Sequence, residues 1–418
     1  MKIKTIVSDY DTVTALPRAE HRKPKKPSIL FRTLTRLAGA GDLRETDFSY
    51  TASEAFRALE GPYLILMNHS CFIDLEIAAR IFYPKPFTIV CTSDGFVGKE
   101  WLMRSLGCIP TQKFVSDLTL IRDMQYSLSA LKTSVLMYPE ASYSFDGCAT
   151  PLPGKLGNLF KMLKVPVVMV RTYGAFARDP LYNCLQKRKV KVSAEVSVLF
   201  TTEEIASLPT AELDRKLGEA FTFDSFAWQE ENGVAISEPF RADGLERILY
   251  RCASCGCEGK MKGEGIALTC GGCGKKLILG VNGRLSAPDG TPPRFAHIPD
   301  WYAWEREEVR KEIGEGTYRL DVPVRIGMMV DYRAIYLVGE GRLVHSEDGF
   351  LLEGCGGKLR YTQKPIASYG LYADYFWYEI GDVICIGNRD CLYYCFPENV
   401  PVAKVRLAAE ELYRRIRG

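Results

Sequence analysis

The 418-residue chain lacks several features that would place it in a particular class of protein. It has no run of 18 or more apolar residues, so we expect no transmembrane helix. Its first ten residues lack the apolar core of a signal peptide. The G-x-S-x-G motif of serine hydrolases is absent. The net charge is only +3, which does not by itself indicate a nucleic-acid-binding protein.

The composition is that of a folded protein with reduced thiols. It is 47% hydrophobic and 25% charged, with 14 cysteines. Without a signal peptide, so many cysteines indicate a reducing compartment rather than a disulfide framework. We therefore expect a cytoplasmic protein, and its length suggests about two or three domains.

The most informative feature is a short apolar run at residues 64–67, which is followed by Asn68, His69 and, five residues after His69, Asp74. A buried strand fixes the backbone, and the turn after it lifts the imidazole out of the core. The carboxylate can then hold one tautomer and stabilise the protonated ring, which makes His69 a candidate general base. Ser70 is a candidate N-cap for the helix that follows. The alternative is a hydrogen-bonded histidine at a strand end, without catalytic function.

Three further blocks follow in order, at residues 107–113, 135–144 and 165–170. Together with the block around His69, they resemble the four motifs of the glycerolipid acyltransferase superfamily, whose best-known members are the 1-acylglycerol-3-phosphate acyltransferases. The resemblance covers about residues 50 to 225 and is specific for the superfamily, though not for the substrate.

The resemblance implies a role for each matched residue. His69 would deprotonate an acceptor hydroxyl, and Asp74 would orient His69. Lys113 stands where the family usually has an arginine that contacts the acceptor's phosphate. Glu140 matches the glutamate that helps to bind the glycerol backbone, and Pro166 matches a mainly structural proline.

The third block departs from the family pattern. Ala141, Ser142 and Tyr143 stand in place of glycine, threonine and arginine. Tyr143 lacks the bidentate phosphate donor of an arginine, and Lys113 keeps the charge without the fork geometry. Lys155 could supply a compensating cation, or it could be a solvated loop lysine. The residues expected to bind substrate are Lys113, Glu140, Ser142 and Lys155.

The function that this resemblance implies is lysophospholipid O-acyl transfer. The donor would be the thioester of acyl-CoA or of acyl-carrier protein, and the acceptor would be a lysolipid of the 1-acylglycerol-3-phosphate kind. No serine need be acylated in this reaction.

Basic residues are concentrated near the N-terminus. Residues 18–44 contain eight Lys and Arg against Glu20 and Asp42. Within this segment, residues 28–38 have apolar side chains at helical spacing. A basic amphipathic helix of this kind can lie on an anionic membrane, so we expect a protein peripheral to the inner face of the membrane. The alternative is a helix that packs on the catalytic domain with its basic face in water.

A second motif consists of two C-x2-C-G knuckles, in which fourteen residues separate the second and third cysteines. Each knuckle directs two thiolates at one point, and four thiolates complete a closed tetrahedral Zn²⁺ site of the structural kind. Cys257 is an additional thiol that could compete as a ligand. Unliganded core cysteines are a poor alternative because the Gly- and Lys-rich segment between the knuckles could hardly form a core without metal. The predicted zinc ligands are Cys252, Cys255, Cys270 and Cys273.

The pattern of apolar segments predicts the domain organisation. Short strands alternate with helices up to about residue 235, as in an α/β domain with a mixed sheet flanked by helices. After residue 316, short strands separated by turns precede a helix at 402–416, a pattern that resembles a pleckstrin-homology-like barrel. The expected units are a basic amphipathic arm (1–48), the acyltransferase domain (49–235), a zinc ribbon (248–285), a helical linker (286–315) and the β-rich domain (316–418).

Two other functions are compatible with the sequence. The altered residues 141–143 fit an acyltransferase-like scaffold that binds lipid or protein, although the presence of His69, Asp74 and Glu140 argues against a lost site. A zinc ribbon can also serve an adaptor that binds nucleic acid. Few aromatic residues interleave with the lysines here, so the sequence does not favour nucleic acid as a partner.

Overall fold

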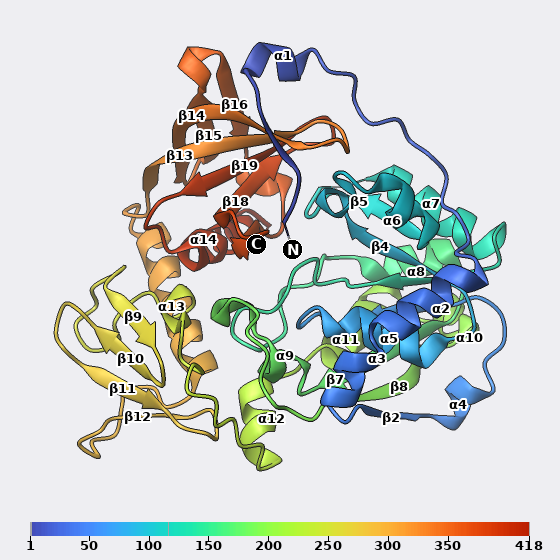
Figure 1. Ribbon diagram of the computed structural model, residues 1–418, viewed down its shortest axis with the longest axis horizontal. Coiled ribbons are helices and arrows are strands. Elements are labelled where there is room, and N and C mark those ends of the chain that lie inside the picture. Colours follow the sequence, from blue (N-terminus) through green and yellow to red (C-terminus); the bar gives the residue numbers. More distant parts are fainter. Residues whose placement is uncertain (1, 116, 418) are drawn as a thin grey trace.

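The computed structural model describes residues 2–115 and 117–417. The expected domain limits at residues 1 and 418 lie outside this range. Three sheets, of seven, four and eight strands, organise the chain, and Figure 1 shows them as separate groups joined by helices. We refer to the parts that carry them as the α/β domain, the cysteine ribbon and the C-terminal domain.

The sheet of the α/β domain is mixed, as the sequence predicts. Strands β3 to β7 run parallel along their pairings, whereas β8 is antiparallel to β7. In spatial order the strands are β2 (Ser49–Ala52), β8 (Ser193–Phe200), β7 (Val167–Tyr173), β3 (Leu64–Met67), β6 (Ser134–Met137), β4 (Phe87–Thr92) and β5 (Cys108–Thr111).

Helices cover both faces of this sheet because successive side chains of a strand point to opposite faces. On β3 every residue is buried. Ile65 and Met67 pack in the cluster that includes α5 (Ile73–Phe82), whereas Leu64 and Leu66 pack on the opposite side. The helices of that opposite side are α7 (Leu118–Ser129), α8 (Leu156–Leu163), α10 (Thr202–Ser207) and α11 (Thr210–Ala220).

Shorter elements complete the α/β domain and its N-terminal segment. The α-helices are α1 (Tyr10–Thr14), α2 (Ile29–Ala38), α3 (Ala40–Glu45), α4 (Glu54–Arg57), α6 (Glu100–Ser105), α9 (Ala175–Arg178) and α12 (Ser225–Glu231). The 3-10 turns are η1 (Ser93–Phe96), η2 (Leu181–Asn183) and η3 (Leu245–Arg247).

The cysteine ribbon is a four-stranded antiparallel sheet that packs against a long helix, α13 (Ile298–Gly314). The side chain of Trp301 on α13 donates a hydrogen bond of 3.0 Å to the carbonyl of Arg251, just before the first knuckle. Leu268 and Leu277 of the ribbon belong to the same buried cluster as Trp301. The strands are β9 (Met261–Glu264), β10 (Ala267–Cys270), β11 (Lys276–Leu279) and β12 (Leu285–Ser286).

The C-terminal domain is β-rich and ends in a helix, as the sequence predicts. Two antiparallel meanders, β13–β16 and β17–β19, are joined where β13 pairs with β19. Residues 335–346 form one long strand, β14. In the described part of the chain the outer strands β16 and β17 are not paired with each other, and closure into a barrel stays a prediction. The elements are β13 (Leu320–Met329), β14 (Ile335–Ser346), β15 (Gly349–Gly354), η4 (Cys355–Gly357), β16 (Leu359–Gln363), η5 (Pro365–Ala367), β17 (Tyr372–Trp377), β18 (Gly381–Gly387), β19 (Leu392–Pro397) and α14 (Val402–Arg417).

The N-terminal segment connects the two large domains. Its strand β1 (Thr5–Val7) pairs in parallel with β14 of the C-terminal sheet. The chain then crosses to the α/β domain, where the His21 ring bonds Asp123 of α7 at 3.0 Å and Pro24 and Pro27 are buried. Figure 1 shows this dark blue segment running from the C-terminal sheet to α2. The segment expected to form a basic arm therefore contacts both domains.

Gly174 tests how tightly the end of β7 is packed. Its φ is +77°, and a Cβ atom there would lie 2.3 Å from the carbonyl oxygen of Lys191. We expect Gly174→Ala to lower the free energy of unfolding by at least about 2 kcal/mol, because both the backbone conformation and the clash oppose a side chain. Thermal unfolding of the full chain measures the change.

Gly218→Ala is the control. No atom lies within 4 Å of its Cβ position in α11, so alanine should stabilise the helix by roughly 0.5–1 kcal/mol. Equal melting temperatures for the two variants would contradict this packing.

Candidate active site

His69 lies where the buried strand β3 ends, in the turn before α5. The preceding Asn68 locks this end of the strand to β7. Its Oδ1 accepts hydrogen bonds from the Thr172 amide at 2.8 Å and from the Thr172 hydroxyl at 3.2 Å. The backbone that carries the imidazole is therefore fixed by the sheet rather than by a flexible loop.

Asp74 orients the His69 ring. Its Oδ2 lies 3.1 Å from Nδ1 of His69 and also accepts the amides of Ser70 at 2.7 Å and Cys71 at 3.2 Å. Asp74 is fully buried, so its carboxylate is fixed in place. The prediction that Ser70 caps α5 is wrong. The N-cap is Phe72, whose side chain makes no capping hydrogen bond. The backbone amides of Ser70 and Cys71 in this turn donate to Asp74 instead.

The loop after β6 holds the His69 backbone from both sides. Glu140 accepts the His69 amide through Oε1 at 3.0 Å, and the Ser144 amide donates to the His69 carbonyl at 3.1 Å. The other oxygen of Glu140 accepts the amide and the hydroxyl of Thr150, both at 2.9 Å. Residues 140–150 therefore help to position the histidine, together with its own strand. Ala141 stands in the left-handed region, with φ of 57°, where the family pattern has glycine.

Two tyrosine rings lie against the imidazole. The ring centroid of Tyr138 is 4.0 Å from that of His69 in a stacked arrangement, and the Tyr143 centroid is 4.3 Å away at a tilt of 45°. These rings restrict the rotation of His69 about its side-chain bonds. Tyr143, which stands where the family pattern has an arginine, thus packs against the His69 ring.

The surroundings of His69 favour its neutral form. Burial lowers the pKa of His69 below its ordinary value of 6.5, while the neighbouring Asp74 opposes this by favouring the imidazolium. The charge of Lys113 lowers the pKa of His69 further. Burial also raises the pKa of Glu140 to about 7, against the three hydrogen bonds that it accepts. A neutral imidazole with a held Nδ1 can accept a proton at Nε2.

Lys113 reaches this site from the loop after β5 and touches the C-terminal domain. Its Nζ lies 4.1 Å from the centroid of the Tyr372 ring on β17. Within residues 2–115 and 117–417 it makes no ion pair. The same strand is fastened to the α/β domain by Asp94, which accepts hydrogen bonds from the Tyr372 hydroxyl and, at 3.3 Å, from the Trp377 indole.

Arg406 of helix α14 also reaches the site. Its guanidinium donates to the Ser142 hydroxyl at 3.0 Å and to the Tyr143 carbonyl at 3.5 Å. Its Cζ lies 4.2 Å from the centroid of the Phe145 ring, and the residue is 3% exposed. A cation from the far end of the chain therefore lies beside the position where the family pattern has an arginine.

The structure brings most of the predicted site residues together. His69, Asp74 and Glu140 share hydrogen bonds, Ser142 follows Glu140 on the same loop, and Lys113 lies close enough to affect His69. Lys155 does not join them. It is exposed at the start of α8, and in the described part of the chain its side chain makes no hydrogen bond or ion pair.

Sequence reasoning missed the contributions of the C-terminal domain. Tyr372 and Arg406 contact the site from positions more than 200 residues after its motifs, and no local spacing relates them to His69. The only signal was the missing arginine at position 143, which implied that a cation had to come from elsewhere.

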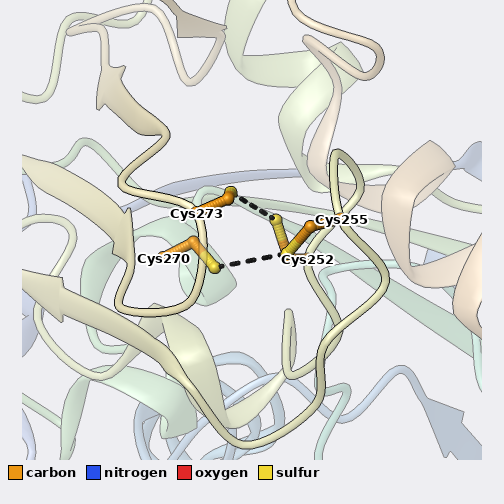
Figure 2. Close-up of side chains that lie close together, drawn as sticks. All are labelled: Cys252, Cys255, Cys270 and Cys273. Carbon is orange, nitrogen blue, oxygen red and sulfur yellow. Dashed lines mark hydrogen bonds between the residues drawn. The ribbon is translucent and has the colours of Figure 1, made fainter.

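The four predicted zinc ligands lie together in the cysteine ribbon. The sulfur atoms of Cys252, Cys255, Cys270 and Cys273 are all within 4.8 Å of one another, as Figure 2 illustrates. Cys252 and Cys273 are 3.8 Å apart, as are Cys255 and Cys270. Thiolates at about 2.3 Å from a tetrahedral zinc ion would be separated by about 3.8 Å. The donor set and its spacing therefore fit a zinc ion.

Cys257 lies beside the cluster but fits it less well. Its sulfur is 3.2 Å from that of Cys255 and 3.3 Å from that of Cys270. Both distances are shorter than the separation of about 3.8 Å between two ligands of one zinc ion. Cys257 is therefore a neighbour of the site rather than a fifth ligand in this arrangement.

Comparison with known proteins identifies an acyltransferase segment in the α/β domain. Residues 47–172 match the family model described as Acyltransferase. This segment contains His69, Asp74, Lys113 and Glu140, and the chain is an acyltransferase. No curated protein matches the chain. Among solved structures, the 1-acyl-sn-glycerophosphate (LPA) acyltransferase PlsC from Thermotoga maritima is similar, with 13% identity, a TM-score of 0.33, and coverage of 46% of this chain and 78% of that one.

Removal of one zinc ligand tests the metal site. We expect Cys270→Ser, which changes a buried ligand, to reduce bound zinc from about one ion per chain to less than about a tenth of that amount and to lower the melting temperature. Metal analysis of the purified protein measures the content. Cys257→Ser is the matched control and should retain zinc. Loss of zinc in Cys257→Ser, with retention in Cys270→Ser, would contradict the assignment of the four ligands.

Proposed function

We propose that the protein transfers an acyl group from a thioester, acyl-CoA or acyl-carrier protein, to the hydroxyl of a lysophospholipid. The observation that carries the proposal is the His69–Asp74 pair, with 3.1 Å between Nδ1 and Oδ2, in a segment that matches the acyltransferase family. The acceptor would be of the 1-acylglycerol-3-phosphate kind.

The reaction needs one base and no covalent enzyme intermediate. The acceptor oxygen attacks the thioester carbonyl while Nε2 of His69 removes its proton. The C–S bond breaks as the new C–O ester bond is completed, and the imidazolium returns the proton to the thiolate leaving group. Asp74 keeps the Nδ1 proton in place and stabilises the imidazolium. In the described part of the chain, Nε2 has no protein partner, which leaves it available to the hydroxyl.

The substrate contacts follow from the remaining site residues. Lys113 makes no ion pair within the described ranges, although its charge lowers the pKa of the buried Asp374 carboxyl, and we assign it to the anionic group of the acceptor. Ser142 and Glu140 line the loop next to His69, and we assign them to the glycerol part of the acceptor. Both oxygens of Glu140 already accept protein hydrogen bonds, so its contribution is as much positional as direct. The exposed Lys155 is the weakest candidate of the set.

Zinc would have a structural role. Cys252, Cys255, Cys270 and Cys273 would hold the ion in a closed set of thiolates, and the ion would supply folding stability to a small sheet with little core of its own. The ribbon packs on α13, so it would also fix the helix that connects the ribbon to the C-terminal domain.

The surface around α2 supports docking on a membrane. Ile29, Leu30, Leu34 and Leu37 are 49% to 63% exposed along this helix. The helix packs on α5 and its C-terminal turn through its basic side instead: Arg36 lies 4.4 Å from the Tyr83 ring centroid, and Arg32 bonds the Pro84 carbonyl. This is the reverse of a helix that keeps its basic face in water.

A neighbouring helix extends this apolar surface. Trp101 on α6 is 71% exposed, and its ring lies 5.9 Å from that of Phe31 on α2. Lys25 and Lys26 are exposed on the approach to α2. An apolar stripe beside exposed lysines fits the interface of an anionic bilayer, where the lipid substrates are found. No helix in the described ranges is long and apolar enough to cross a membrane.

Two alternatives have specific support. The replacement of the motif arginine by Tyr143 favours a binding scaffold, but the ordered His69–Asp74 pair has no use in a scaffold. Lysines on the cysteine ribbon, such as Lys260 and Lys275, favour a nucleic-acid adaptor only weakly, because no aromatic platform accompanies them.

His69→Ala tests the base directly. We expect kcat/KM with a lysophosphatidic acid acceptor and an acyl-CoA donor to fall by about 10²- to 10⁴-fold, because general base catalysis is lost. The assay follows release of the free thiol. Lys155→Ala is the control, and it should retain activity within a few-fold. Equal activity of His69→Ala and wild type would remove His69 as the base, and absence of transfer in every protein, with zinc bound, would favour the scaffold.

The pH dependence separates the two members of the pair. In the proposed mechanism only neutral His69 is active, and its pKa lies below 6.5. We therefore expect kcat/KM to stay constant from neutral pH down to about pH 6.5 and to decline only when the pH falls further, through this lowered pKa. Asp74→Asn removes the group that raises the pKa of His69. We therefore expect this variant to be slower, by at least about 10²-fold, yet with its acid limb displaced to lower pH. An acid limb displaced to higher pH would contradict the assigned role of Asp74.

Leu34→Glu and Leu37→Glu test the membrane surface. Each introduces a charge into the exposed stripe, so we expect binding to vesicles that contain phosphatidylglycerol to weaken by about tenfold or more. Cosedimentation measures the bound fraction. Val281→Glu is the control, because Val281 is similarly exposed, at 45%, but lies in the cysteine ribbon. Unchanged binding by both leucine variants would exclude α2 as the docking element.

A further inference from the structure

A pocket of about 310 Å³ lies next to the active-site loop, between residues 145–151 and the helices α13 and α14. Its volume lies at the lower end of the roughly 300–1,000 Å³ of small-molecule sites. Three arginines line it: Arg306 from α13, and Arg406 and Arg414 from α14. Thr150 lies on its opposite wall. Figure 1 shows α14 at the lower edge of the C-terminal sheet, above α13.

The pocket adjoins the catalytic base through its lining residues. Thr150 donates two hydrogen bonds of 2.9 Å to Glu140, whose other oxygen holds the His69 amide. From the other wall, Arg406 bonds the Ser142 hydroxyl, next to the tyrosine that lies on the His69 ring. The pocket lining and the loop that holds His69 are therefore connected by hydrogen bonds on two sides.

Carboxylates hold the three guanidinium groups in position. Arg306 bridges Glu410 at 2.7 Å and Glu411 at 2.9 Å, Arg406 bonds Glu410 at 3.1 Å, and Arg414 bonds Glu411 at 2.6 Å. A guanidinium has five N–H donors, so these pairs leave donors available, most of all on Arg414. The charged lining residues are the three arginines, Asp146 and Glu410, and Glu411 behind them pairs with two of the arginines. The fixed charge is therefore close to balanced, and a phosphate would be held by the free N–H donors rather than by net charge.

The third motif lacks the arginine that would bind phosphate, and Lys155 does not replace it. We propose that this pocket binds a phosphate group of the substrate through Arg306, Arg406 and Arg414, so that helix α14 supplies the cation that position 143 lacks. The inference rests on the proposed function for the identity of the substrate, but phosphate binding itself can be measured without acyl transfer. The phosphate could belong to the lysolipid acceptor or to the CoA donor.

A purely structural role is the alternative, because the same ion pairs also join α13 to α14. Arg310 provides the matched control. It pairs with Glu411 at 2.9 Å, as Arg414 does at 2.6 Å, and the two side chains are equally exposed, at 49% and 47%. Arg310 does not line the pocket. A structural network would respond similarly to the loss of either arginine, whereas a phosphate site would not.

The experiment compares Arg414→Gln, Arg406→Lys and Arg310→Gln with wild type in the full chain. We expect Arg414→Gln and Arg406→Lys to raise KM for the phosphate-bearing substrate by about tenfold, the effect of one lost charged hydrogen bond. Arg310→Gln should stay within twofold of wild type. Acceptor and donor are varied separately, and monoacylglycerol serves as the acceptor without phosphate. An increase confined to lysophosphatidic acid places the acceptor phosphate in the pocket, and one confined to acyl-CoA places the donor's there.

Calorimetry with glycerol 3-phosphate and with adenosine 3′,5′-bisphosphate, the nucleotide part of CoA, provides a readout that needs no turnover. Binding by wild type that weakens in Arg414→Gln but not in Arg310→Gln supports the pocket, even if no lysolipid is acylated. Acyl transfer by all variants with unchanged KM values and unchanged phosphate binding would overturn the inference while leaving the proposed function intact. A similar loss in Arg310→Gln and Arg414→Gln would overturn it in favour of the structural network.

Discussion

The carboxylate of Glu140 is the interaction on which the active site depends. One oxygen accepts the amide of His69 at the end of β3, and the other accepts the amide of Thr150 in the loop after β6. Two strands and a loop thus meet at one buried group, which is 3% exposed. Because a buried carboxylate without partners would be costly, the three hydrogen bonds and the loop conformation require one another. The histidine is placed as a consequence of this closure.

One buried carboxylate oxygen also fixes the His69 imidazole. Asp74 accepts two backbone amides of the turn that contains His69, so it closes the turn and orients the ring with one oxygen. Tyr138 and Tyr143 then restrict the ring. His69 is held by atoms within a few residues of it and by one neighbouring loop, which explains why short motifs carry so much information about its position.

The C-terminal domain contacts this site directly through its side chains. Lys113 lies over the ring of Tyr372. Asp94 accepts hydrogen bonds from both Tyr372 and Trp377, and Arg406 donates one to Ser142. Strand β1 pairs with the C-terminal sheet, and the segment that follows it contacts the α/β domain. The cysteine ribbon packs on α13, next to α14. Contacts from several directions therefore restrict the position of α14, and a guanidinium on such a helix can serve a site in another domain.

The sequence by itself determined the features whose parts lie close together in the chain. The strand at 64–67, the His69–Asp74 spacing, the two cysteine knuckles and the mixed α/β pattern depend on local geometry, which residue spacing encodes. It also identified both faces of the helix at 29–38, yet not which of them packs, because an amphipathic pattern distinguishes two faces without naming the partner of either. Only the tertiary structure turned the arginines of α2 inward and its leucines outward. It alone brought Arg406 to Ser142 and removed Lys155 from the site, because contacts between residues hundreds of positions apart depend on domain packing and leave no periodic trace in the chain.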